Sequence, residues 1–428
     1  MAYTKTTSTS YGSRLGSSFK GIFSGIILFI AATILLWWNE GRAVRQYDNI
    51  AASQKECQHV DDVSKKSGSI ENCCIHATAE VKTDDILTLE NDPLGVSINA
   101  VKYEREVEYY QYEEHTETTK EDKIGGKEET TTTYTYEKTW TSSPVDSKSF
   151  EDPAYKNVNS IYYQLDDAKA VAKNVTFGAY KLSDSFISSI SGTTDTDLKP
   201  DMAKLKDLDS KIAQLKGNYA ANVIAAVDAV MSNDSTSAES EAAETIDLTY
   251  VHIKGNVVYI GRNEAAPEIG DVRITYTQVD PGTFSLIGKV VNGEIQANKT
   301  DKGTFSMINR GNVAMEDMFK SAEESNNIWT WVLRIVGILL VIGGLKSMFG
   351  FFVTLLKVLP FLSNIADVAS SIVCSIVGIV WSFIVIAIAW LFYHPLIALC
   401  ILVPVAVGIF FLIKMSKDKK KAAAAAEA

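Results

Sequence analysis

The sequence predicts an α+β membrane protein: one N-terminal transmembrane helix, a large β-rich extracytoplasmic domain with a helical insertion, and three C-terminal transmembrane helices. Three observations predict this fold class. The apolar residues of the 428-residue chain gather in four blocks near its two ends. The stretch between those blocks alternates polar and apolar residues, which is typical of strands. Both ends of the chain are basic, whereas the middle is acidic.

The first apolar block runs from Gly21 to Trp38 and contains no charged residue. A helix of that length spans about 27 Å, close to the ~30 Å hydrocarbon core of a bilayer. Two tryptophans close the block, as expected at a membrane interface. We interpret residues 21–38 as a transmembrane helix rather than a cleaved signal peptide, because Asn39-Glu40-Gly41-Arg42 is a poor cleavage site.

Three further blocks lie near the C-terminus. They predict transmembrane helices over residues 328–345, 368–392 and 396–413. Four blocks with tryptophans at their edges argue against buried core helices. Between the first two of these helices, residues 346–367 form an apolar segment with a narrow polar stripe. This pattern predicts a cytosolic segment that is either interfacial or a half-helix packed on the spans, broken at Pro360.

The flanking charges predict the orientation. Residues 1–20 carry three basic residues and no acid, and residues 414–428 are also basic. Both tails should therefore be cytosolic, which four spans satisfy. Residues 39–327 then form the extracytoplasmic domain, with 30 basic and 49 acidic residues. This charge opposes binding to anionic lipid, and the net charge of −11 for the whole chain argues against nucleic acid as a partner.

Alternating residues predict strands in the domain. Val101 to His115 and Thr132 to Trp140 flank Gly125-Gly126 and predict a long β-hairpin. Further strands are expected over Asp247–Tyr259, Asp271–Val279 and Thr283–Val291.

Residues 199–245 break the strand pattern. Apolar residues recur there at three- and four-residue intervals, which predicts a helix. They are Leu205, Leu208, Ile212, Leu215 and Tyr219. Two interpretations stay open at this stage, a self-association arm or a helical hairpin packed on the sheet.

The sequence contains none of the common catalytic or nucleotide-binding motifs: no G-x-S-x-G, H-E-x-x-H, P-loop or G-x-G-x-x-G. We therefore predict no enzyme, no catalytic residue, no metal and no cofactor. The nearest constellation consists of Cys57, His59, Cys73, Cys74 and His76. A disulfide from Cys57 to Cys73 or Cys74 is one interpretation, unpaired thiols are a second, and a zinc or copper site is a third.

Arg334 is the one charge inside the second apolar block, about 9 Å from its start. An unpaired arginine costs about 2.5–3.5 kcal/mol at the middle of a membrane and less near its edge. We expect Arg334 either to pair with Glu40 at the end of the first span or to snorkel to the interface.

Six short motifs occur in a fixed order around these spans. They are Asn39-Glu40-Gly41-Arg42-Ala43, Val107-Glu108-Tyr109-Tyr110-Gln111-Tyr112-Glu113, Ser147-Lys148-Ser149-Phe150, Gly270-Asp271-Val272-Arg273, Thr330-Trp331-Val332-Leu333-Arg334 and Tyr393-His394-Pro395-Leu396. From about residue 20 to 414 the chain resembles the LUMA family of transmembrane protein 43-like proteins. The resemblance singles out structural or partner-binding positions at Asn39, Glu40, Gly41, Arg42, Tyr109, Gln111, Gly270, Asp271, Trp331, Arg334 and Pro395.

The resemblance implies a non-enzymatic, four-span membrane protein that self-associates. Animal members reside in the endoplasmic reticulum and inner nuclear membrane and are linked to emerin and lamins. Those partners are expected only in a eukaryote, whereas a bacterial member would lie in the inner membrane. The chain departs from the animal pattern at residues 199–245 and at Cys73-Cys74.

We therefore expect a membrane scaffold that contacts the bilayer, further copies of itself and other membrane proteins. An oligomeric channel or lipid-handling protein is the alternative. The last two predicted spans carry no charge along which a substrate could pass, which favours the scaffold.

Overall fold

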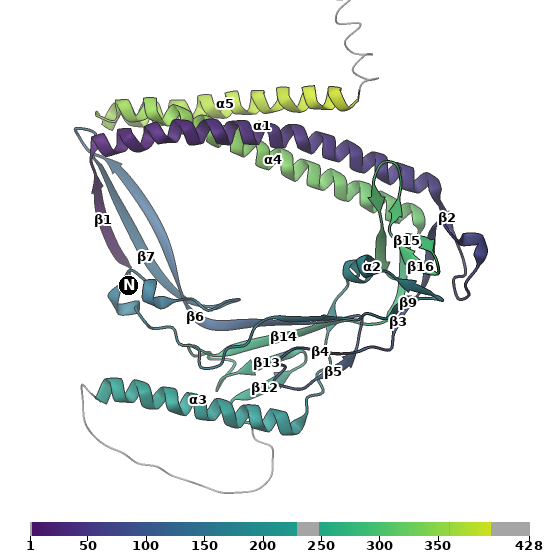
Figure 1. Cartoon of the computed structure of the whole chain (residues 1–428). Helices are drawn as coiled ribbons and strands as arrows, with labels where there is room; N and C mark the ends of the chain where they lie inside the picture. The colour runs from purple at the N-terminus through teal and green to yellow at the C-terminus, as the bar shows by residue number, and fades with distance from the viewer. Residues whose placement is uncertain (1, 229–247, 359, 395–428) are drawn as a thin grey trace, which may run out of the picture.

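The computed structural model describes residues 2–228, 248–358 and 360–394, which form a flattened ring (Figure 1). Three long helices form one side of the ring, and a β-sheet covered by a fourth long helix forms the opposite side. The fold is thus mixed α+β, with a large β-rich region, as predicted.

The three helices on one side are α1 (Tyr11–Glu56), α4 (Met315–Leu356) and α5 (Pro360–Tyr393). Each contains a stretch long and apolar enough to cross a membrane. The predicted span 21–38 is the middle of α1, which extends well beyond it at both ends. The predicted fourth span, 396–413, and the tail 414–428 lie outside the described residues.

The segment predicted at residues 346–367 is divided between two long helices, with the predicted break at Pro360. Helix α4 continues without a break to Leu356, and α5 begins at Pro360. Proline is favoured at the start of a helix, because its missing N–H would have no partner there and its φ is already helical. Pro360 therefore separates two long helices rather than the halves of one short helix.

Glycines let α1 and α4 approach closely. A Cβ added at Gly344 would lie 2.9 Å from the backbone nitrogen of Phe29 and 3.0 Å from the carbonyl oxygen of Gly25. A Cβ at the adjacent Gly343 would meet only the Cδ2 atom of Leu28, at 3.8 Å. The backbones of the two helices are therefore in contact at Gly344 but not at Gly343.

We expect Gly344→Ala to lower the stability of the helical layer by about 1–3 kcal/mol, because the added methyl group must push two backbones apart. Gly343→Ala is the matched control. It should change stability by less than about 0.5 kcal/mol, since it adds an ordinary van der Waals contact. Thermal unfolding of both variants in lipid nanodiscs, followed by the helical circular dichroism signal, measures the difference. Equal effects would contradict the close approach at Gly344.

The strands form two main sheets. The first has the order β1-β7-β6-β14-β13-β12, with β8 paired to β6 and β11 to β14. Its strands are β1 (Tyr3–Thr9), β7 (Glu128–Thr141), β6 (Lys102–Asp122), β14 (Val272–Val279), β13 (Val257–Ile260), β12 (Val251–Lys254), β8 (Ala168–Val171) and β11 (Thr194–Asp195). The predicted hairpin around Gly125-Gly126 is confirmed as β6 and β7. The strand predicted over Asp247–Tyr259 is instead a second hairpin, β12–β13, because Gly255 turns the chain there with a positive φ.

The second sheet closes on itself, since β15 pairs with both β3 and β16 and the path returns through β10 and β9. Its strands are β3 (Cys74–Thr83), β9 (Val175–Phe177), β10 (Tyr180–Leu182), β16 (Glu294–Gln296) and β15 (Gly282–Val291), with β2 (Cys57–His59) and β19 (Met307–Arg310) beside them. Small pairs are formed by β4 (Ile86–Thr88) with β5 (Ser97–Asn99) and by β17 (Asn298–Lys299) with β18 (Thr304–Phe305). Short helices complete the domain: α2 (Asp184–Ser189), η1 (Gly68–Ile70), η2 (Ser147–Ser149) and η3 (Pro153–Tyr155).

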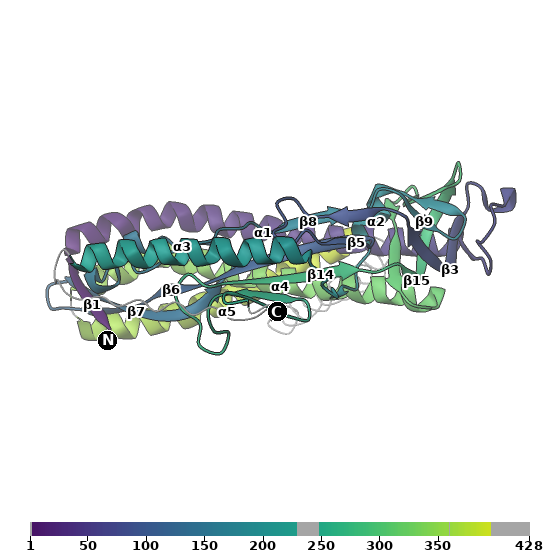
Figure 2. The ribbon, with the colours of Figure 1, turned by 90° about the horizontal axis from the view of Figure 1, so that it is seen from below.

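Helix α3 (Met202–Asp228) lies across the first sheet on the outer side of the ring (Figures 1 and 2). Leu205, Leu208 and Ile212 are buried in the main hydrophobic core together with residues of the sheet. The described part of the predicted insertion is therefore packed on the sheet, the second of the two interpretations. Residues 229–247 lie outside the described residues.

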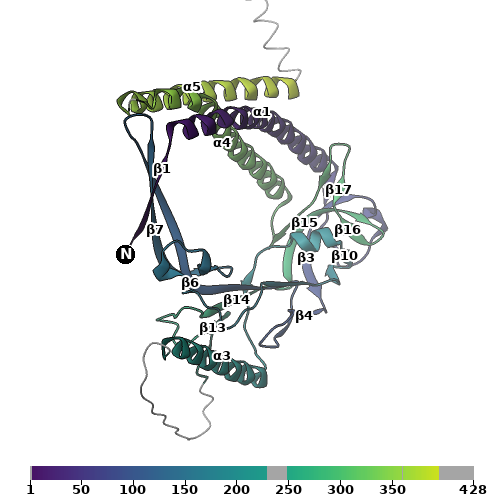
Figure 3. The same cartoon turned by 60° about the vertical axis from the view of Figure 1, so that its left-hand side comes forward.

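The N-terminal segment is not a separate tail, contrary to the prediction for residues 1–20. Strand β1 pairs antiparallel with β7 over seven residues, from Tyr3 opposite Tyr134 to Thr9 opposite Glu128. The tip of the β6–β7 hairpin then contacts the N-terminal end of α1 and the connection between α4 and α5 (Figure 3). This contact closes the ring.

Candidate functional site: the junction of the helices with the β domain

The end of the helical layer nearest the second sheet carries a network of polar side chains. Its centre is an ion pair in which the Nε and Nη2 atoms of Arg334 on α4 each lie 2.7 Å from a carboxylate oxygen of Glu40 on α1. The Glu40 side chain is 2% exposed and that of Arg334 is 18% exposed. Of the two arrangements expected for Arg334, the structure has the ion pair with Glu40. The Trp331 ring also packs on the guanidinium group of Arg334.

Hydrogen bonds continue this network toward the domain. Asn39 donates to the carbonyl oxygen of Thr330, and Arg42 donates to the side chains of Asn39, Asn326 and Thr330. The bond between Arg42 and Asn39 lies within α1, and the other three cross from α1 to α4. The motif that follows the first apolar block therefore fixes the angle and register of these two helices.

Gly41 brings α5 to the same place. A Cβ at this position would lie 2.5 Å from the Tyr393 ring, so only glycine lets α5 come this close. A cavity of about 280 Å³ opens beside the ion pair. Its lining includes Glu40, Tyr47, Trp331, Arg334, Trp390 and His394. Pro395, the remaining predicted residue of this group, lies outside the described residues.

A second polar cluster joins two motifs that are far apart in the sequence. Strands β6 and β14 pair with Tyr109 opposite Val272, which places Gly270-Asp271 beside Tyr110. The Asp271 side chain is fully buried. It accepts hydrogen bonds from the Tyr259 hydroxyl at 2.5 Å, from the Tyr162 hydroxyl at 2.8 Å and from the Glu268 backbone N–H at 2.8 Å.

The charge of Asp271 is balanced by Lys216 of α3, whose Nζ atom lies 2.8 Å away. Burial, and then the neighbouring carboxylate, raise the pKa of Tyr162 and Tyr259 above the usual tyrosine value, so both hydroxyls remain donors. Asp271 thus ties α3, the Tyr162 segment and the sheet together.

Tyr109 and Gln111 also have structural partners. The Tyr109 hydroxyl donates to the carbonyl oxygen of Leu165 and accepts from its N–H. Gln111 donates to the carbonyl oxygen of Ser143 and accepts from the N–H of Val145. These two motif residues therefore hold the chain that leaves β7 against β6.

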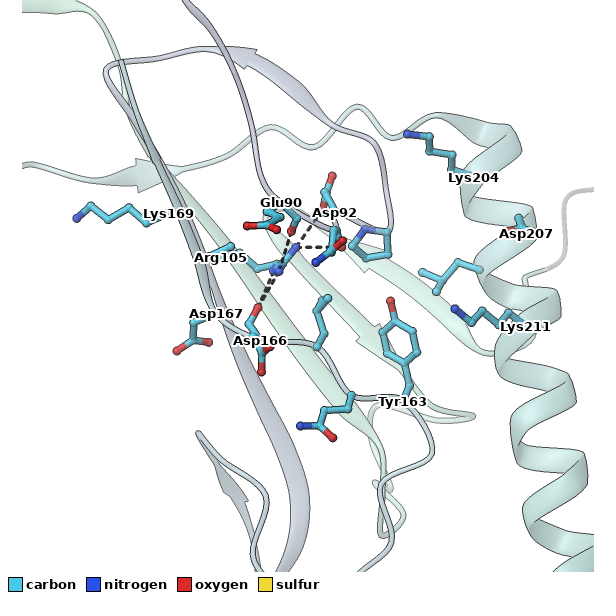
Figure 4. Close-up of a pocket in the computed structure, with 16 residues that line it drawn as sticks. Glu90, Asp92, Arg105, Tyr163, Asp166, Asp167, Lys169, Lys204, Asp207 and Lys211 are labelled. Carbon is cyan, nitrogen blue, oxygen red and sulfur yellow. Dashed lines mark hydrogen bonds and ion pairs between the residues drawn. The ribbon is translucent and has the colours of Figure 1, made fainter. Parts of the chain in front are cut away.

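A polar pocket of about 940 Å³ lies between the first sheet and α3 (Figure 4). Arg105 forms its floor and was not identified from the sequence. Its guanidinium group donates to the carbonyl oxygens of Asp166, Glu90 and Asn91 and lies 3.8 Å from the carboxylate of Asp92. All three nitrogen atoms of the guanidinium group donate within the chain, so Arg105 stabilises the fold here.

The predicted cysteine and histidine constellation is split into two pairs. Strands β2 and β3 run parallel with Cys57 opposite Cys74 and His59 opposite His76. All described cysteines are free, and the Cys73 thiol contacts backbone carbonyls of its own loop. A disulfide from Cys57 to Cys73 or Cys74 stays a prediction. Contact with the Cys57 thiol, and then burial, raise the pKa of Cys74. Among the described residues no group of three or more metal-binding side chains is placed to hold an ion.

The two histidines connect the domain to the membrane helices. The Nδ1 atoms of His59 and His76 lie 2.8 Å apart, and Nε2 of His76 lies 3.0 Å from the carbonyl oxygen of Val313, just before α4. His76 Nε2 therefore carries the proton, and its Nδ1 accepts from His59. Burial lowers the pKa of His76 below its usual value.

We expect the domain to lose stability as pH falls below about 6.5, the value for an unperturbed histidine. A lowered pKa means that the unfolded chain binds the proton more readily, so acid favours unfolding by up to about 1.4 kcal/mol per pH unit. The hydrogen bond to the carbonyl oxygen of Val313 and, less strongly, the Glu316 carboxylate raise the pKa of His76 and partly offset the effect of burial. His76→Gln should flatten this dependence, and thermal unfolding between pH 5 and 8 measures it. An unchanged slope would contradict this role of His76.

Comparisons with known proteins agree with the order of these motifs. A family model described as Transmembrane protein 43 matches residues 109–395. Transmembrane protein 43 of Homo sapiens is 25% identical over 411 residues, which cover 92% of this chain and 91% of the relative. The protein of Rattus norvegicus is 25% identical over 90% of this chain and 87% of its own, and the Drosophila melanogaster homolog is 23% identical over 88% and 90%.

No solved structure matches the chain. The family model covers well over half of the residues, and the relatives are matched along nearly their whole length. Together with the three apolar helices, these matches make the protein an integral membrane protein. The chain belongs to the transmembrane protein 43 family.

Proposed function

We propose that this protein is a non-enzymatic membrane scaffold that self-associates through its helical layer and presents its acidic β domain to other membrane proteins. The observation that carries the proposal is the closed ring. The helices and the domain are joined at both ends. At one end Asn49 of α1 donates to the carbonyl oxygen of Thr304, and His76 of β3 contacts the carbonyl oxygen of Val313 just before α4. At the other end the β6–β7 hairpin contacts Arg14 of α1. Such a frame holds the domain at a fixed distance from the membrane.

The helical layer supports self-association. Helix α5 contacts α1 and α4 on one side, while its other sides expose large apolar residues along its length. They include Val368, Ile372, Ile376, Phe383 and Phe392. In lipid, helices associate through close packing, and α5 offers that surface to a second copy.

Two features of the β domain support the proposal that it presents a binding surface to other proteins. The polar side chains at Asp271 and Arg105 are satisfied by partners within the chain, which makes the sheet a rigid platform. Its acidic charge suits partners with basic surfaces and speeds their association at low salt. Emerin and lamins belong to this proposal only for a eukaryotic source.

The mass of the purified full chain in lipid nanodiscs tests self-association. We expect dimers or larger species, and we expect Ile376→Ser with Phe383→Ser to shift the distribution toward monomer. Ser17→Ala, a change on the exposed polar side of α1, is the control and should leave the mass unchanged. A monomer at all protein-to-lipid ratios overturns self-association. Ion conductance of the reconstituted protein would instead favour the channel alternative.

A further inference from the structure

The closed ring restricts how the helices can enter a bilayer. The sheet and α3 run beneath α1 and α4 for most of the length of these helices (Figures 1 and 2). A membrane that crossed the helices at right angles around residues 21–38 would therefore also contain part of the sheet. That sheet carries Glu104, Glu106 and Glu108 on β6 and has open edges. Unpaired backbone groups and charges of this kind are not tolerated in hydrocarbon.

Three contacts hold the far end of the ring closed. Strand β1, which precedes α1, is paired with β7 of the hairpin. Arg14 of α1 donates to the carbonyl oxygen of Gly126 at the hairpin tip and forms ion pairs with Asp122 at 2.6 Å and Glu128 at 3.2 Å. The side chain of Arg14 is 6% exposed, so this pair is shielded from solvent.

The connection between α4 and α5 reaches the same hairpin tip. The N–H of Gly125 donates to the carbonyl oxygen of Val358, and Lys357 lies 3.5 Å from the carboxylate of Asp122. The segments that precede α1 and that join α4 to α5 thus both touch the β domain. In a chain whose helices crossed the bilayer with the domain beyond it, both segments would lie on the opposite side.

The surface of α1 agrees with an orientation parallel to the membrane. It contacts α5 through Phe29 and Trp37. At 100° per residue, the side of α1 opposite these contacts carries Ser17, Lys20 and Ser24, all of which are exposed. Figures 1 and 3 show α5 on the face of the helical layer away from the sheet, so these exposed polar residues lie on the side of α1 that is turned away from α5.

From these observations we infer that α1, α4 and α5 lie along the membrane, embedded in the hydrocarbon of the leaflet nearer the domain, and that β1 and the α4–α5 connection share the compartment of the β domain. The occupant of the outward apolar surface is then lipid. This surface includes Phe23, Ile30 and Ile34 on α1, and the exposed residues of α5. The three helices would then bind the membrane as an interfacial helix does, with their long axes in the plane of the membrane. The inference does not depend on self-association.

The depth of two residues on α1 tests the inference directly. Phe23 and Ile34 are both exposed on the same flank of α1 and are eleven residues apart, or about 16 Å along the helix. Nitroxide labels at Phe23→Cys and Ile34→Cys, in full chains whose five native cysteines are replaced by alanine, report depth in nanodiscs through oxygen and nickel relaxation. Equal depths support the inference. A depth difference of about 16 Å overturns it.

Sidedness gives an independent measurement. Thr4 and Thr283 are exposed on β1 and β15. In sealed vesicles, we expect an impermeant maleimide to label Thr4→Cys and Thr283→Cys from the same side, and labelling from opposite sides overturns the inference. A disulfide between Thr6→Cys and Thr131→Cys, whose hydroxyl oxygens lie 3.4 Å apart, should form and shift the gel mobility. Thr6→Cys with Thr132→Cys, which lies on the other face of β7, is the matched control. If opposite labelling is found while the nanodisc mass still shows oligomers, the scaffold proposal survives without this orientation.

Discussion

Asp271→Ala is expected to lower the stability of the β domain by about 3–5 kcal/mol, the cost of removing one partner from a buried ion pair. The substitution leaves the Lys216 ammonium group without its nearest carboxylate and the hydroxyls of Tyr162 and Tyr259 without their acceptor. Unmet hydrogen bonds in the interior add to the loss. Urea denaturation, followed by tyrosine and tryptophan fluorescence, measures the free energy of unfolding.

Glu268→Gln is the matched control for this experiment. Glu268 is the second carboxylate near Lys216, at 3.4 Å, but its side chain is 63% exposed. An exposed pair of this kind contributes at most about 1 kcal/mol, so the control should remain close to the native stability. If both variants lose the same amount, Asp271 is not the residue that ties α3 to the sheet.

The role of Asp271 could be located from the sequence only in part. The order of motifs singled out Gly270 and Asp271, and the alternating pattern placed a strand directly after them, which is β14. The partners of Asp271 could not be predicted, because Tyr162 and Lys216 are 109 and 55 residues away along the chain. No local periodicity connects residues across such distances.

Strand β1 is a second feature that could not be predicted from local sequence patterns. Its threonine-rich sequence has a high strand propensity, but a single strand needs a partner, and that partner lies about 125 residues further along. Basic residues in the same segment predicted a cytosolic tail instead. Arg14 was counted there as a membrane-flanking charge, whereas in the structure it is buried against Asp122 and Glu128.

Apolar length and alternation were more informative, because both are local properties. They located three of the four apolar blocks within long helices and found β6, β7, β14 and β15. Length alone does not state whether a helix crosses a membrane or lies along it. That distinction depends on what the two ends of the helix contact, which the fold as a whole determines.

The pair of Glu40 and Arg334 gives the second large expected effect. Glu40→Gln removes the charge that balances Arg334 while keeping the size of the side chain, and it should lower stability by about 3 kcal/mol in nanodiscs. Arg334→Gln leaves the buried Glu40 carboxylate uncompensated, and the loss should be at least as large, since Glu40 is the more buried partner.

The double variant shows whether Glu40 and Arg334 stabilise the protein through their interaction with each other or independently. With both charges removed, two amides can hydrogen-bond to each other, so Glu40→Gln with Arg334→Gln should be more stable than the sum of the single changes predicts by about 1–3 kcal/mol. This double-mutant cycle is measured by thermal unfolding of the native protein, the two single variants and the double variant in nanodiscs. Simple additivity would mean that Arg334 reaches the lipid–water interface without help from Glu40. In that case the junction would owe its geometry to Asn39, Arg42 and Thr330, whose hydrogen bonds also join α1 to α4.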